Sequence, residues 1–205
     1  MKLKEKEQTF DSPKPNQDIA PGTNAKNEGL KRRICALSDK IVELLLRQLQ
    51  HELYNHNLYR SFANYYGING LAVLESYYIK RAEEEKLHHD WIINYLNYND
   101  AAVIYPEIPE IKEDWDDPVT PFKLTVDKEI ETTNLIKEIV NASLAEKDWF
   151  TFAWLMGNSP IEGKLLPEQV EEESISRTAL DIAEGEGSWL RKEKSILNAY
   201  EGDDD

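Results

Sequence analysis

The stretch from Ala82 to Ile93 constrains this chain more than any other. Apolar residues recur at helical spacing on both sides of it, and Glu85 and His88 interrupt that apolar stripe. Because residues three apart share one face of an α-helix, the carboxylate and the imidazole are predicted to project together. Some helical bundles use this Glu-x-x-His spacing to hold iron or manganese. An exposed charged face with a satisfied histidine would produce the same pattern.

The charge of the chain favours cations as partners. Its 205 residues suit one domain with a sizeable core, and the formal net charge is -15. Residues 1–33 have a local balance of +3, which leaves -18 on the remainder. Nucleic acids and anionic membranes are therefore disfavoured as partners of the main body, whereas metal cations are attracted to it.

The sequence predicts a cytoplasmic protein without a membrane span. Cys35 is the only cysteine, so no intrachain disulfide is expected, as in a reducing compartment. The first residues lack the apolar run of a signal peptide. No segment approaches the roughly 20 apolar residues that a transmembrane helix needs.

We expect three regions: a flexible N-terminal tail over residues 1–35, a helical bundle over 36–200 and an acidic tail over 201–205. The first region is polar, contains three prolines and lacks hydrophobic periodicity. Its basic run from Lys31 to Arg33 could contact DNA or lipid, or could be a solvated linker end.

The predicted fold class is all-α, a four-helix bundle with a short fifth helix. The expected long helices cover about residues 38–65, 70–97, 120–146 and 165–182, and the short one covers 188–199. Ser38 and Thr120 are the expected N-caps. Residues 98–119 contain three prolines and predict a long crossover, which allows the third helix to run parallel to the second. Residues 147–163 are harder to assign, and one or two helical turns are expected there.

Every long helix places polar side chains on or beside its apolar stripe. The third-helix stripe is predicted to run through Val126, Ile130, Thr133, Ile136, Val140 and Leu144, with Glu129 at its border. The full polar set is Glu52, Glu85 with His88, Glu129, and Gln169 with Glu172. No Lys or Arg is expected beside these acids. Unpaired buried carboxylates cost several kcal/mol each, so the cluster must bind cations, stay protonated or remain exposed. Carboxylates with one imidazole suit iron, manganese or zinc.

These residues lie in runs that resemble the ferritins. The similar runs are residues 52–54 with 58–59, residues 82–88, Glu129 and residues 168–172, and the likeness covers about residues 37–199. The resemblance implies iron storage, with oxidation of Fe(II) by O2 or H2O2 at a dinuclear ferroxidase centre inside the bundle. It also implies self-association into a shell of about 24 subunits.

The resemblance implies a role for each polar residue. Glu52, Glu85 and His88 would hold the first iron ion. Glu85, Glu129 and Glu172 would hold the second, with Gln169 nearby. Tyr59 would lie beside the pair as a hydrogen-bond partner or electron donor, or would be an ordinary core tyrosine. Glu84, Glu168 and Glu171 resemble a third, inner iron site, or form a solvated acidic face.

The fourth-helix run favours the non-haem bacterial ferritins within this superfamily. Bacterioferritins and di-iron oxidases resemble one another in carrying Glu-x-x-His twice, but here Glu172 stands where the second histidine would be. Haem is not expected, because Met1 and Met156 are the only methionines. The chain departs from the family in its long N-terminal tail and in an apparent insertion at 157–163. Glu162 in that insertion would line a pore for iron, or the loop decorates the surface.

Two other functions remain open at this point. A di-iron carboxylate oxidase or peroxidase that acts on a non-iron substrate would be a small oligomer with a second Glu-x-x-His. A miniature-ferritin-like protein could associate with DNA through the basic tail, although its metal site would lie between subunits rather than inside one bundle.

Overall fold

The computed structural model describes residues 35–111, 115 and 117–202. Most of the predicted N-terminal tail and the last three residues of the predicted acidic tail therefore lie outside the described residues. Within them the chain forms six helices and no strand, which confirms the all-α prediction. The helices are α1 (Asp39–Ile68), α2 (Ala72–Tyr98), α3 (Thr120–Glu146), α4 (Trp149–Leu155), α5 (Leu165–Glu184) and α6 (Trp189–Glu201).

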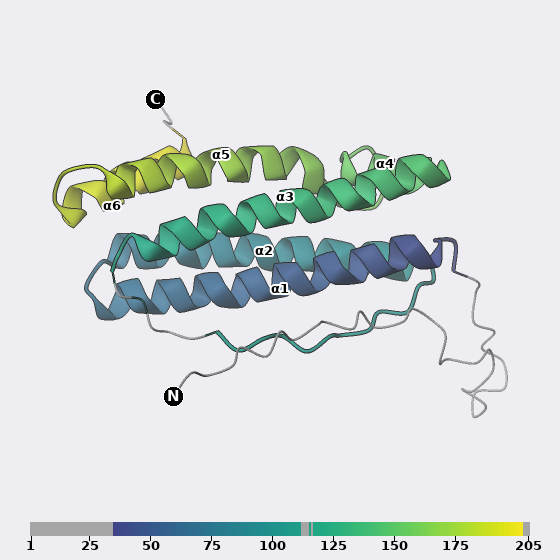
Figure 1. Cartoon of the computed structure of the whole chain (residues 1–205), viewed down its shortest axis with the longest axis horizontal. Helices are drawn as coiled ribbons and strands as arrows, with labels where there is room; N and C mark the ends of the chain where they lie inside the picture. Colours follow the sequence, from purple (N-terminus) through teal and green to yellow (C-terminus); the bar gives the residue numbers. More distant parts are fainter. Residues whose placement is uncertain (1–34, 112–114, 116, 203–205) are drawn as a thin grey trace, which may run out of the picture.

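Helices α1 and α2 form an antiparallel hairpin (Figure 1). Ser38 caps α1 as predicted, since its Oγ accepts a hydrogen bond from the backbone N–H of Ile41 at 3.2 Å. Helix α1 ends at Ile68, about one turn later than expected. Gly70 permits the tight turn into α2, because it adopts a φ of +75°.

The crossover places α3 parallel to α2, as predicted. It runs back along the length of the bundle, so that α3 starts near the end at which α2 starts (Figure 1). The prediction that Thr120 caps α3 is wrong: Val119 precedes the helix and Thr120 is its first residue. Asp117 explains the difference, because its Oδ1 accepts from the backbone N–H groups of Val119 and Thr120 at 2.7 and 3.0 Å.

Helix α4 fills the segment that was hardest to assign from sequence. Asp148 caps it by accepting from the backbone N–H of Thr151 at 3.0 Å. Trp154 anchors it, because the indole stacks on Tyr95 with ring centroids 4.1 Å apart and donates to the carbonyl of Glu162 at 3.0 Å. The segment between α4 and α5 is therefore tied to the bundle.

Glu52 of α1 and Gln169 and Glu172 of α5 are buried, as expected, but the predicted face of α3 is partly wrong. Glu129 was expected at the border of the α3 stripe and is fully buried, whereas Leu144 was expected inside and is 42% exposed. The buried line of α3 instead includes Thr125, Thr132 and Ile139. Hydrophobicity misplaced this face because much of it is polar.

Two apolar clusters occupy the two ends of the bundle interior. One includes Ile41, Leu45, Leu49, Trp91, Ile92, Ile136 and Trp154. The other includes Tyr59, Phe62, Tyr78, Phe122, Ala179 and Ile196. The polar residues of α1, α2, α3 and α5 lie between these clusters in the sequence of each helix. Apolar packing on both sides therefore fixes the helices that carry them. None of the helices in the described part of the chain is long and apolar enough to cross a membrane.

Gly163 offers a test of the α4 anchor. A Cβ at this position would lie 2.2 Å from Nε1 of Trp154, so Gly163→Ala is expected to displace the indole and lower the free energy of unfolding by about 1–3 kcal/mol. The matched control is Gly187→Ala, which has a positive φ of +131° but nothing within 4 Å. Thermal unfolding followed by circular dichroism would measure both. Equal losses in the two variants would contradict the close-packing explanation.

Candidate metal centre

A compact group of buried ligand atoms lies in the middle of the bundle. Glu52 of α1 and Glu85 and His88 of α2 offer ligand atoms that all lie within 4.8 Å of one another. All three side chains are buried, so few water molecules can solvate their charges. Two carboxylates and an imidazole at this separation suit one transition-metal ion.

The carboxylates of this group are incompletely satisfied by the protein. The amide of Gln48 donates to Oε1 of Glu52 at 2.6 Å, whereas Oε2 of Glu52 and Oε2 of Glu85 lack a hydrogen-bond partner among the described residues. Burial, followed by the negative charges of Glu129 and Glu52, raises the pKa of Glu85 well above its usual range. A cation between the two carboxylates would bind the unpartnered oxygens and would offset the cost of burying their negative charges. The residues therefore fit a metal ion.

His88 is oriented by a carboxylate on another helix. Its Nε2 lies 2.9 Å from Glu168 of α5, and its Nδ1 lies 3.9 Å from Oε2 of Glu85. Burial opposes protonation of His88, but Glu172 and the hydrogen bond with Glu168 outweigh it and raise its pKa to about 9. If Nε2–H donates to Glu168, loss of the Nδ1 proton on metal binding would leave Nδ1 facing Glu85 as a metal ligand, an arrangement that is common at metal sites.

The acids expected to hold a second ion form a neighbouring group. Glu129 is fully buried and accepts hydrogen bonds from the hydroxyl of Tyr59 at 2.6 Å and the amide of Gln169 at 3.0 Å. Glu172 lies 3.8 Å from Nε2 of His88. Burial raises the pKa of Glu172 to about 8, although the positive charges of His88 and Arg81 oppose the rise. Burial and the negative charge of Glu129 raise the pKa of Tyr59. The structure therefore brings both predicted groups into one polar layer.

Arg81 overturns one expectation of the sequence analysis. No Lys or Arg was expected beside the acids, but the guanidinium of Arg81 is 1% exposed and lies 2.6 Å from Glu129 and 3.8 Å from Glu172. Sequence reasoning passed over it because Arg side chains usually carry their charge to the surface. Its position one turn before Glu85, on the same helix face, was the available signal. The ion pairs that it forms among the described residues do not include Glu52 or Glu85.

An acidic cavity of about 370 Å³ opens beside this layer, between α2, α5 and α6. Glu84, Glu168 and Glu171, the predicted third site, all line it, together with Arg81, His88 and Glu172. Tyr200 of α6, which sequence reasoning missed, donates to Oε1 of Glu84 at 2.5 Å, and Lys164 pairs with Glu168 at 2.6 Å. Metal binding by these three glutamates stays a prediction.

Glu162 lies away from this layer. Its side chain is exposed on the segment between α4 and α5, and its carbonyl accepts the hydrogen bond from Trp154. A pore would be formed with other subunits, so the proposed role of Glu162 stays a prediction.

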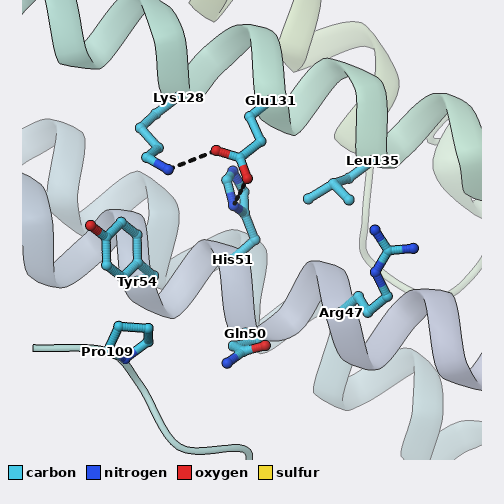
Figure 2. A pocket seen from close by; sticks show the side chains of 8 residues that line it. All are labelled: Arg47, Gln50, His51, Tyr54, Pro109, Lys128, Glu131 and Leu135. Atoms are coloured by element: carbon cyan, nitrogen blue, oxygen red, sulfur yellow. Dashed lines mark hydrogen bonds and ion pairs between the residues drawn. The ribbon is translucent and has the colours of Figure 1, made fainter. Parts of the chain in front are cut away.

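A second cavity lies between α1, α3 and the crossover (Figure 2). Arg47, His51, Tyr54, Lys128 and Glu131 are among its lining residues, and Lys128 pairs with Glu131 at 2.6 Å. Its basic side chains make it less attractive to metal cations than the acidic cavity. Of the two, the acidic cavity is the better approach for a cation.

His51 in the second cavity is held in its neutral form. The hydroxyl of Thr132 donates to the carbonyl of Lys128 at 3.0 Å, so its oxygen is available to accept from Nε2–H of His51 at 2.8 Å. Burial lowers the pKa of His51 below its usual 6.5, although Glu52 and Glu131 act in the opposite direction.

This shift predicts a loss of stability in acid. The unfolded chain binds a proton at His51 more readily than the folded chain, so the contribution of His51 to the free energy of unfolding falls as pH drops below about 6.5. His51→Gln removes this titration and is expected to reduce the loss between pH 7 and pH 5. Thermal midpoints of chelator-treated wild type and variant would measure it. Identical pH dependence in the two proteins would contradict the assignment.

Comparison with known proteins identifies the family. A family model described as a ferritin-like domain matches residues 42–182. A bacterial non-heme ferritin of Campylobacter jejuni is 30% identical over 145 residues, which cover 71% of this chain and 83% of that protein. One from Staphylococcus saprophyticus is 26% identical with the same coverage.

Solved structures agree with this result. An open pore ferritin from the hyperthermophilic archaeon Archaeoglobus fulgidus superposes with a TM-score of 0.71 at 27% identity, covering 80% of this chain and 98% of that one. A ferritin from Chlorobium tepidum gives a TM-score of 0.66 at 25% identity, covering 72% and 85%. Sequence family and fold therefore lead to one conclusion: this chain belongs to the ferritin-like family.

Proposed function

We propose that this protein stores iron, and that it oxidises Fe(II) at the buried polar layer before storage. The observation that carries the proposal is the Glu52–Glu85–His88 group, whose ligand atoms converge within 4.8 Å while two carboxylate oxygens lack a partner among the described residues. Membership of the ferritin-like family supports iron as the cargo.

The acidic body and the acidic cavity supply the route for the substrate. Fe(II) is drawn toward the glutamates that line the cavity and reaches His88 and Glu172 at its inner wall. Glu52, Glu85 and His88 bind one Fe(II). Glu85 has two oxygens and also binds a second Fe(II). Glu129 and Glu172 are the other ligands of this second ion.

The protein residues then set the conditions for oxidation. Carboxylates favour Fe(III) over Fe(II), because the higher charge gains more from anionic ligands. Two Fe(II) ions supply two electrons, which dioxygen accepts with two protons to leave as hydrogen peroxide. Fe(III) is the stronger Lewis acid, so its bound water loses protons readily and the product hydrolyses toward a mineral.

Storage also requires an enclosed space. One solved relative from Archaeoglobus fulgidus is described as an open pore ferritin, and an engineered variant of it as a closed form. We therefore propose that this chain also assembles into a closed shell with pores, and that Glu162 lines one of them.

Removal of the shared ligand tests the oxidation step. Glu85→Ala is expected to slow aerobic Fe(II) consumption by at least about 100-fold, because both proposed ion positions lose a carboxylate. Glu83→Ala is the matched control, since Glu83 is the exposed carboxylate two residues earlier on the same helix, and its rate is expected to match the wild type. Stopped-flow absorbance after mixing with Fe(II) would measure the rates. A Glu85→Ala rate equal to that of the wild type would refute the site.

Assembly is tested separately by mass. A shell of about 24 copies of the 23.7-kDa chain has a mass of roughly half a megadalton. Size-exclusion chromatography with light scattering is expected to show this species without added iron. A monomer or dimer at micromolar concentration would favour a small di-iron oxidase instead of a storage shell.

A further inference from the structure

The second ion position already holds a positive charge that belongs to the protein. Arg81 places its guanidinium 2.6 Å from Oε1 of Glu129 and 3.8 Å from Oε1 of Glu172. These are two of the three carboxylates that the second ion requires. The first ion position is not paired with Arg81. Within the described residues, the ion pairs of Arg81 go to Glu84, Glu129 and Glu172.

This charge cannot be removed by loss of a proton. An arginine side chain stays protonated in proteins, and although burial opposes its charge, Glu129 and Glu172 raise the pKa of Arg81 further. A divalent ion bound by Glu129 and Glu172 would repel the guanidinium and compete with it for the same oxygens. The second ion can therefore bind tightly only after the guanidinium moves.

The structure provides a place for the displaced guanidinium. Arg81 lines the acidic cavity, and its Nη1 already lies 3.5 Å from Glu84 on the cavity wall. Its Nε lacks a hydrogen-bond partner among the described residues, so rotation of the side chain would break no hydrogen bond at Nε. Rotation toward Glu84 and Glu171 would keep the guanidinium paired with carboxylates and release Glu129 and Glu172.

We propose that Arg81 is a built-in counter-ion that occupies the second metal position and makes loading of the centre sequential. One ion binds first at Glu52, Glu85 and His88. The second ion binds only by displacing Arg81 into the acidic cavity. This inference rests on the proposed function, because it takes Glu129 and Glu172 as ligands of the second ion.

The test uses anaerobic titration of the metal-free full-length protein with Co(II), followed by calorimetry and visible absorption. The wild type is expected to bind one Co(II) per subunit tightly and a second at least about 10-fold more weakly. Arg81→Gln is expected to tighten the second step by about 10-fold or more and to leave the first unchanged. Arg81→Lys keeps a positive charge and is expected to retain the weak second step.

The control for net charge is Lys80→Gln, which removes one charge from an exposed neighbour paired with Glu201. Its two binding steps are expected to match those of the wild type. The inference would be overturned if the wild type bound both Co(II) ions with equal affinity and Arg81→Gln altered neither step. That result would leave the metal centre intact. Absence of a tight first step in every protein would instead refute the proposed function.

Crystals of the wild type give an independent measurement if Arg81→Gln fails to fold. They would be soaked at rising Co(II) concentrations and examined by anomalous diffraction. The expected result is density near His88 at low concentration, and density between Glu129 and Glu172 only together with movement of Arg81. Density at the second position with Arg81 still against Glu129 would overturn the inference.

Discussion

The burial of several carboxylates in one layer of the bundle is the constraint on which this structure depends. Four long helices each place an acid in this layer, where burial leaves the charges poorly solvated by water. A few hydrogen-bond donors partly satisfy these acids. Gln48 donates to Glu52, and Tyr59 and Gln169 donate to Glu129. Arg81 pairs with Glu129 and Glu172. These donors leave the oxygens between Glu52 and Glu85 unsatisfied. The position with least internal compensation is therefore the one that most favours a cation.

The same layer has two different sides. Toward the acidic cavity, carboxylates are accessible and the rim includes Tyr200 from the last helix. Toward α1 and the crossover, the second cavity has Arg47 and Lys128 along its wall, and His51 is held neutral by burial. Cations would thus approach from the α2–α5 side. This asymmetry of charge gives a centre inside one bundle a preferred direction of loading.

The four long helices, their order and the crossover were predictable because each leaves a strong local signal. Ser38 marked the start of α1, the prolines of residues 98–119 marked the crossover, and periodic apolar residues marked the helix that carries Glu85 and His88. The face of α3 was misplaced where Thr125, Glu129 and Thr132 replace apolar residues, because hydrophobicity cannot identify a buried polar face. Spacing placed Glu85 and His88 on one helix face, and the resemblance to the ferritins grouped them with Glu52. Arg81 and Tyr200 were not predicted, since their burial and contacts depend on tertiary packing between helices distant in sequence.

The two apolar clusters have a consequence for how the centre meets its first ion. Each cluster joins several helices on one side of the polar layer, so the ligands are held from both ends without help from a metal. A centre of this kind does not need to fold around its ion. Preorganisation of the donors means that little conformational entropy is lost when the first ion binds.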